Sequence, residues 1–134
     1  MGLFSNWVAG DFQQQAAEFC DLCRASYGLE LDFSPSTLNQ LDDLIDHLFG
    51  PGTADANAAL IVAMGCYVGE VVLRAHGGSW RADEEFFHSP AVVIEGKLQT
   101  RTFPLSRVWR RFEYGPEQSL VAYYTEVRRT LARL

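Results

Sequence analysis

The feature that most constrains this chain is an apolar run at residues 58–73. Thirteen of its sixteen residues are Ala, Val, Ile, Leu, Met, Cys or Tyr, so a helix here is apolar on nearly every face and must be buried. Gly65 and Gly69 lie four residues apart on one face, where another segment can approach closely. That packing must offset roughly 1 kcal/mol of helix propensity lost per glycine. We therefore predict a central, buried helix over residues 55–76.

The whole chain has the size and composition of one globular domain. It has 134 residues, of which 48% are hydrophobic and 21% charged, enough to bury a sizeable core over residues 1–134. The apolar run is shorter than the roughly 20 residues of a membrane span and contains Glu70, and the first residues lack a signal-peptide pattern. The three cysteines, an odd number, are typical of reduced thiols, and the basic residues are almost all Arg. We expect a cytoplasmic bacterial protein without membrane contact.

Two amphipathic helices are expected before the central helix. The first covers about residues 11–27, with Asp11 as N-cap and Gly28 as the stop. The second begins at Ser34-Pro35, with Ser34 as the N-cap and Pro35 as the first helical residue. Residues 1–10 are apolar without a period, so we expect an N-terminal arm that packs on the body or on a neighbour.

Two groups of residues in these helices have metal-ligand chemistry. Asp42, Asp43 and Asp46 can act as paired carboxylates, but nothing nearby in the sequence completes a ligand set, and a solvated acidic face is expected. Cys20 and Cys23 form a C-x-x-C pair inside a predicted helix, where buried thiols are the expected state. The sequence therefore predicts neither a metal site nor a cofactor.

A small antiparallel sheet should follow the central helix, over residues 79–102. Residues typical of strands and of turns define the strands and connections of this sheet. These are strands at about residues 79–82, 91–94 and 97–102, an acidic loop at 83–85 and a tight turn at Glu95-Gly96.

Two helices should follow the sheet, and they complete an α+β fold with four to five helices. The first begins near Phe103-Pro104 and the second covers about residues 117–134. In the first, an inward stripe at helical spacing is expected to consist of Leu105, Val108, Trp109 and Phe112. We expect Trp109 and Phe112 in the core, together with Trp80. Three arginines should project from the flanks: Arg107, Arg110 and Arg111.

Glu70 is the most informative polar residue because it is the one charge in the apolar run. A carboxylate in such a helix must find partners or take up a proton. Arg74 follows four residues later in the favourable order, and arginine offers a planar fork that stays charged. We therefore predict that Glu70 pairs with Arg74 or with one of the three flanking arginines. The candidate binding residues are Glu70, Arg74, Arg107, Arg110 and Arg111.

Four short motifs occur in order along the second half of the chain. They are Gly65-x-x-x-Gly69-Glu70, Gly77-Gly78-x-Trp80, Phe103-Pro104-x-Ser106-Arg107, and the stretch from Gly115 to Tyr124. Together they resemble a family of small bacterial domains of unknown function, over roughly residues 58–125. The resemblance implies helices with a small sheet, and it implies no activity and no catalytic residue.

Charge and motif content favour a binding function. Residues 1–70 carry ten acidic side chains and one basic one, and residues 71–134 carry seven acidic and ten basic ones, so the halves can attract each other within one chain or between two. A pI near 4.9 makes nucleic acid an unlikely partner, although one anion could be held near the arginines. No nucleophile motif, phosphate loop or dinucleotide fingerprint is present. We predict a non-enzymatic binding or regulatory module for a protein partner or a second copy; the alternative is a small enzyme built on Glu70, His76 and nearby arginines.

Overall fold

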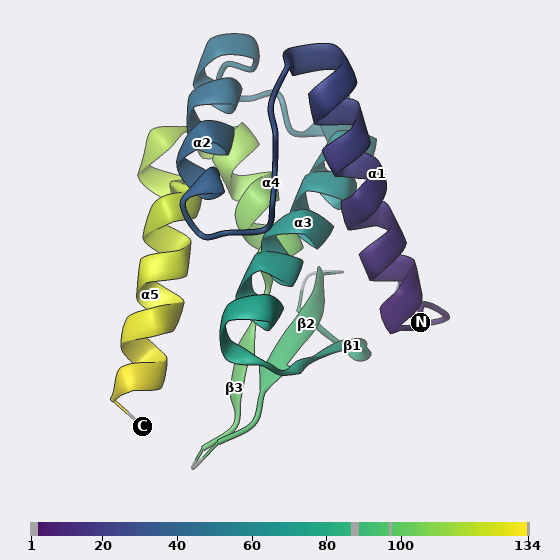
Figure 1. Cartoon of the computed structure of the whole chain (residues 1–134), viewed down its shortest axis with the longest axis vertical. Helices are drawn as coiled ribbons and strands as arrows, with labels where there is room; N and C mark the ends of the chain where they lie inside the picture. The colour runs from purple at the N-terminus through teal and green to yellow at the C-terminus, as the bar shows by residue number, and fades with distance from the viewer. Residues whose placement is uncertain (1–2, 87–88, 97, 134) are drawn as a thin grey trace.

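The computed structural model describes residues 3–86, 89–96 and 98–133. These residues form an α+β fold of five α-helices and one three-stranded antiparallel sheet, as the sequence predicts (Figure 1). The elements in chain order are α1 Ala9–Tyr27, α2 Thr37–Leu48, α3 Ala58–His76, β1 Ser79–Phe86, β2 Ser89–Ile94, β3 Thr100–Thr102, α4 Pro104–Tyr114 and α5 Leu120–Ala132. Single 3-10 turns, Asp55–Asn57 and Pro116–Gln118, come shortly before α3 and α5.

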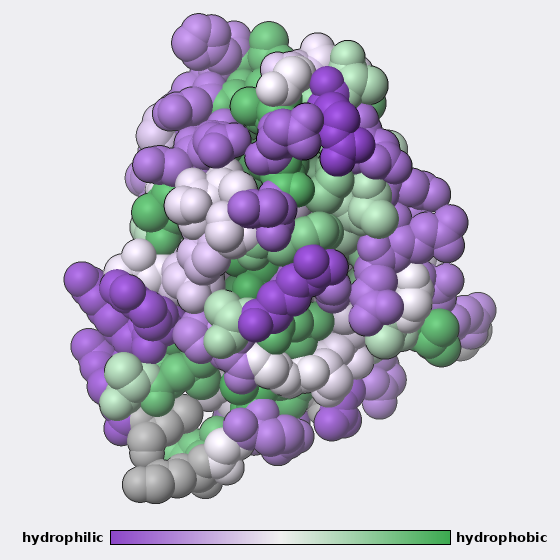
Figure 2. All heavy atoms as spheres, in the orientation of Figure 1, coloured by the Kyte–Doolittle hydropathy of each residue, from purple (hydrophilic) through white to green (hydrophobic). Residues whose placement is uncertain are grey.

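Helix α3 is the centre of the fold, with α1 on one side, α4 on the other and β2 against its C-terminal part. Residues 64–72 are buried without interruption. A Cβ on Gly65 would lie 2.8 Å from the Cα of Leu105, and a Cβ on Gly69 would lie 2.2 Å from the ring of Trp80. The close approach predicted at both glycines is confirmed. On the face shown in Figure 2, hydrophobic residues are visible in the middle between hydrophilic side chains, some of which lie across them.

By length and hydropathy alone, residues Asp55–His76 could cross a membrane. More than half of the most apolar window of this segment is buried inside the protein. That burial is typical of the core helix of a globular domain, and the absence of membrane contact stays a prediction.

The sheet has the order β1-β2-β3, with both pairs antiparallel. β1 is longer than predicted: residues 83–85, expected in a loop, lie within it, because a bulge between Arg81 and Glu85 accommodates the extra residues. The connection from β2 to β3 covers residues 95–99 and is longer than the predicted two-residue turn. Lys97, predicted to begin the third strand, lies outside the described residues.

Two helix starts differ from the predicted ones, and one helix end agrees. Asp11 is not the N-cap of α1; its carboxylate accepts the backbone N–H of Val8 at 2.8 Å from within the first turn. Gly28 ends α1 in the left-handed conformation, with φ 66°. α2 begins at Thr37, because Ser34 forms a turn in which its carbonyl accepts the Thr37 N–H at 3.0 Å.

The N-terminal arm packs on the body through aromatic side chains. The ring of Phe4 is buried, 4.9 Å from the ring of Trp7 and 6.4 Å from that of Phe12 on α1. Val8, by contrast, is exposed. Residues 1–2 of the predicted arm lie outside the described residues.

Candidate functional site

Glu70 lies in a filled part of the core and is 4% exposed. Its Oε2 accepts a hydrogen bond from Nε1 of Trp80 at 2.8 Å. The predicted ion pair with Arg74 is present but long, with 3.9 Å between Nε and Oε1, and the exposed Arg74 guanidinium also lies 3.5 Å over the ring of Phe33. The nearest partner of Glu70 is therefore an indole, which was not predicted. A signal existed, because a buried Trp N–H needs an acceptor.

His76 is not brought together with Glu70. Six residues on one helix separate the two side chains by about 9 Å along the axis and turn them to different faces. The Nε2 of His76 lies 3.1 Å from the hydroxyl of Tyr124, and burial, with the charge of Arg128, holds the pKa of His76 below its usual value. Neither Glu70 nor His76 lines either cavity described below.

Arg111 does not project into solvent as predicted, because its side chain is 2% exposed and paired with carboxylates of α2. Its Nε donates to Oδ1 of Asp42 at 2.9 Å, and its Nη2 donates to Oδ1 of Asp46 at 2.6 Å. These bonds join the acidic first half of the chain to the basic second half. Two carboxylates neutralise the guanidinium, which allows it to be buried between helices.

The prediction that Asp42 faces solvent is also wrong, because Asp42 is buried. Besides Arg111, it accepts from the Ser119 hydroxyl at 2.9 Å and from the backbone N–H groups of Leu120 and Val121 at 3.0 and 3.1 Å. A carboxylate of α2 therefore caps the N-terminus of α5, where the helix dipole favours negative charge. This cluster joins α2, α4 and α5 and has a structural role.

Arg107 and Arg110 lie elsewhere on α4. Arg107, also predicted to project, is buried, and its guanidinium donates to the carbonyl of Ser119 at 3.1 Å and to Glu126 at 2.8 Å. Arg110 is exposed as predicted and makes no ion pair within the part of the chain that the structure describes. The five candidate residues therefore occupy three separate places and do not form one site.

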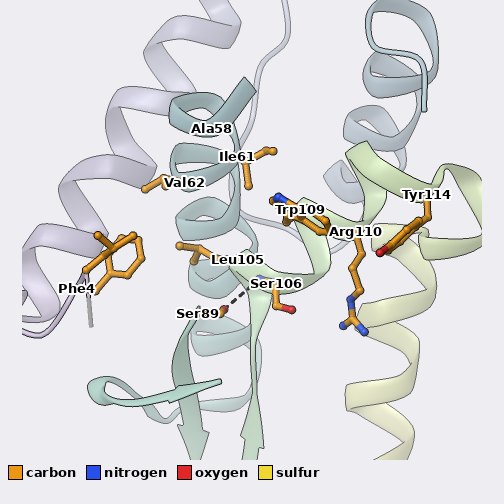
Figure 3. A pocket seen from close by; sticks show the side chains of 11 residues that line it. Phe4, Ala58, Ile61, Val62, Ser89, Leu105, Ser106, Trp109, Arg110 and Tyr114 are labelled. Atoms are coloured by element: carbon orange, nitrogen blue, oxygen red, sulfur yellow. Dashed lines mark hydrogen bonds between the residues drawn. The ribbon is translucent and has the colours of Figure 1, made fainter. Parts of the chain in front are cut away.

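An apolar groove of about 550 Å³ opens between α3, α4 and the N-terminal arm (Figure 3). The backbone N–H of Ser106 donates to the hydroxyl of Ser89 at 3.0 Å on its floor. Trp109 and Tyr114 lie at one end, with their rings edge to face at 5.9 Å, and Arg110 lies between them in the view. The apolar side chains lining the groove are Leu3, Phe4, Ala58, Ile61, Val62 and Leu105.

The prediction that Trp109 lies in the core is wrong, because its side chain is 37% exposed. Trp80 and Phe112 are buried, as predicted. The buried face of α4 is rotated toward the two arginines that carboxylates neutralise, Arg107 and Arg111. This rotation leaves Trp109 at the edge of the buried face. The amphipathic pattern of the sequence places every arginine on the solvent-facing side of a helix. The prediction therefore misplaced the centre of the buried face of α4.

The three cysteines lie in the core. Cys20, Cys23 and Cys66 are all free and buried, as predicted. Burial raises the pKa of Cys66 to about 12, with a smaller contribution from the nearby charge of Glu70. Within residues 3–86, 89–96 and 98–133, no three His, Cys, Asp or Glu side chains are grouped so that they could hold a metal ion.

The chain was compared with known proteins at the levels of family, sequence and structure. No protein-family model matches it, and neither a curated protein nor a solved structure matches it. The resemblance to a family of small bacterial domains therefore stays a prediction, as does the cytoplasmic location.

Proposed function

We propose that this chain is a non-enzymatic protein-binding module whose groove holds an apolar segment of a partner protein. The observation that carries the proposal is the groove itself, an open hollow of about 550 Å³ with apolar walls. Binding sites are typically concave and mostly apolar, with few polar groups. Trp, Tyr and Arg are the residue types most enriched where protein partners bind tightly, and Trp109, Tyr114 and Arg110 form one end of the groove.

The lining of the groove indicates the chemistry of the partner segment. Apolar side chains would pack against Ile61, Val62 and Leu105 in the middle of the groove. An acidic side chain next to them would pair with Arg110, whose guanidinium has no carboxylate partner among the described residues. We therefore expect a segment with one or two apolar anchors followed by Asp or Glu.

The surroundings of Glu70 support binding over catalysis. Its carboxylate is held by Trp80 in a packed core and faces no open cavity among those described. An acid or base catalyst must reach its substrate within hydrogen-bond distance. Glu70 is therefore better explained as part of the core than as a catalyst.

Selection from a displayed peptide library tests the proposal without a known partner. Peptides enriched on the native chain are measured by fluorescence polarisation against Val62→Glu, which places a charge in the groove, and against Val121→Glu. Val121 is an exposed apolar residue of α5 that lines neither cavity. We expect Val62→Glu to weaken binding at least about tenfold, since losing a central contact costs more than about 1 kcal/mol, and Val121→Glu to leave it unchanged.

Three results would separate the outcomes. Peptides that bind Val62→Glu as well as the native chain, or a library without enriched sequences, would contradict binding in the groove. Light scattering of the native chain at rising concentration identifies the second-copy case: a dimer that Val62→Glu abolishes would make the partner another molecule of this chain.

A further inference from the structure

The apolar groove runs between two helices that pack against each other, α3 and α4 (Figure 3). Its α3 wall consists of Ala58, Ile61 and Val62, which share one face at helical spacing. Its α4 wall begins at Leu105 and ends at Tyr114. The rise of a helix between those two positions is about 14 Å, or two and a half turns. A groove of this shape between packed helices accepts the side-chain ridge of a third helix.

The walls of the groove are poor backbone partners for an extended peptide. The N–H and C=O groups in the interior of α3 and α4 are bonded within these helices. The Ser106 N–H, in the first turn of α4, already donates to Ser89, and Pro90, which follows on β2, has no N–H to give. An extended segment in this apolar groove would bury unpaired backbone groups, which is unfavourable. A helix satisfies its own backbone and brings only side chains to the groove.

Arg110 gives the groove a charged end. It is exposed and makes no ion pair with any residue that the structure describes. Arg110 also lines a second cavity, of about 260 Å³, among the residues of β3, α4 and α5. Most residues around that cavity are polar or charged, so the apolar side chains of a partner fit the groove and not the second cavity. An apolar centre beside a polar rim is typical of protein interfaces.

We propose that the occupant of the groove is an amphipathic α-helix of a partner protein, about ten residues long to match the α4 wall. This inference rests on the protein-binding function proposed above. The apolar anchors of the helix recur every three or four residues and pack against Ile61 and Leu105, as in other helix-in-groove complexes. An Asp or Glu on the same face pairs with Arg110. The helix covers Trp109 and Tyr114, which are 37% and 53% exposed without it.

Two displayed peptide pools of equal composition test this inference. One pool carries Leu and Glu on one face at helical spacing, and the other carries the same residues in the strict alternation of a strand. We expect the native chain to enrich peptides from the helical pool, and the enriched peptides to bind Val62→Glu at least about tenfold more weakly.

The pools also separate this inference from the function on which it rests. Equal or greater enrichment from the alternating pool, with the same loss in Val62→Glu, overturns the helical occupant and leaves binding in the groove intact. Enrichment from neither pool overturns both. A dimer of the native chain that an enriched helical peptide dissociates overturns the separate partner, because a second copy then fills the groove.

Proline substitution of an enriched peptide tests its helical conformation directly. Pro at an interior position that faces away from the groove removes a helical hydrogen bond, and it should weaken binding about a hundredfold. Pro at the first helical position of the same peptide is the matched control and should leave binding unchanged. Equal affinities of the two proline peptides would overturn the helical occupant.

The pairing with Arg110 is tested at low ionic strength, because salt screens exposed charges. Arg110→Gln should weaken binding about fivefold, the effect of one unit charge at about 4 Å in water. Replacing the Glu of the peptide by Gln should abolish this difference, and a loss that persists overturns the pairing. Arg24→Gln, at an exposed arginine of α1 that lines neither cavity, should leave binding unchanged. Urea midpoints near that of the native chain show that each variant is folded.

Discussion

Asp42 gives the sharpest test of how this fold is held together. Its carboxylate accepts four hydrogen bonds, two from the side chains of Arg111 and Ser119 and two from the backbone N–H groups of Leu120 and Val121. Asp42→Asn keeps the shape, removes the charge and turns an amide NH₂ toward groups that are themselves donors. Both the ion pair between α2 and α4 and the cap of α5 are weakened by this one change.

The expected loss of unfolding free energy follows from the burial of the pair. Removing one partner of a buried ion pair costs about 3–5 kcal/mol, because the other charge is stranded. Asp46 remains as a half-exposed partner of Arg111, which places the expected loss at the lower end, about 3 kcal/mol. For a chain of this size the melting temperature should fall by roughly 12 °C. The variant should still fold, since native domains have about 5–15 kcal/mol of stability.

Urea unfolding followed by tryptophan fluorescence and circular dichroism measures this loss as a lower midpoint at unchanged slope. Asp43→Asn is the matched control, because Asp43 is exposed on the same helix; it should change stability by no more than about 0.5 kcal/mol. A double-mutant cycle with Arg111→Met should give a coupling energy above about 1 kcal/mol. A loss of unfolding free energy below about 1 kcal/mol in Asp42→Asn would be typical of an exposed ion pair. It would show that the contacts of Asp42 between α2, α4 and α5 do not stabilise the fold as proposed.

Three further predictions follow from the core and from the pKa shifts. Gly69→Ala should lower the free energy of unfolding by about 3 kcal/mol or more, because its Cβ would overlap the ring of Trp80. Gly10→Ala, in a helix with open space around it, should raise it by about 0.5–1 kcal/mol. Equal melting temperatures of the two variants would contradict this packing. The thiol of Cys66, with its pKa raised to about 12, should react with a thiol reagent near pH 8 only when the protein unfolds, and labelling faster than unfolding would count against its burial. The lowered pKa of His76 means that the unfolded chain binds its proton more readily, so stability should fall as the pH drops below about 6.5, and His76→Gln should flatten that dependence in urea titrations.

Local sequence patterns were sufficient for the elements of this fold. The apolar run at residues 58–73 predicts a buried helix because no face of it is polar, and it forms α3. Glycines end three of the helices: Gly28, Gly77 and Gly115 are the C-caps of α1, α3 and α4, and each has a positive φ that few other residues tolerate. The α+β class and the position of the sheet could be predicted because the helical spacing of apolar residues ends near residue 76 and short strand-like segments follow.

The polar residues are where local patterns were not enough. Asp42 and Arg111 are 69 residues apart in the chain, and each taken alone reads as an exposed charge on an amphipathic helix. Only when α2, α4 and α5 pack together do the two charges neutralise each other and become buried. The same packing rotates α4 and leaves Trp109 at the edge of the groove.

What the sequence by itself determined is which segments are helix or strand and which helix is central, because these depend on contacts along one element. What only the tertiary structure decided is which charges are neutralised and which hollows remain open. Glu70 is bonded to Trp80 rather than to an arginine of α4, and Arg110 borders two cavities and makes no ion pair with any residue that the structure describes. The physical reason is that the free energy of a charge depends on its distance from other charges and from water, and those distances exist only in the folded chain.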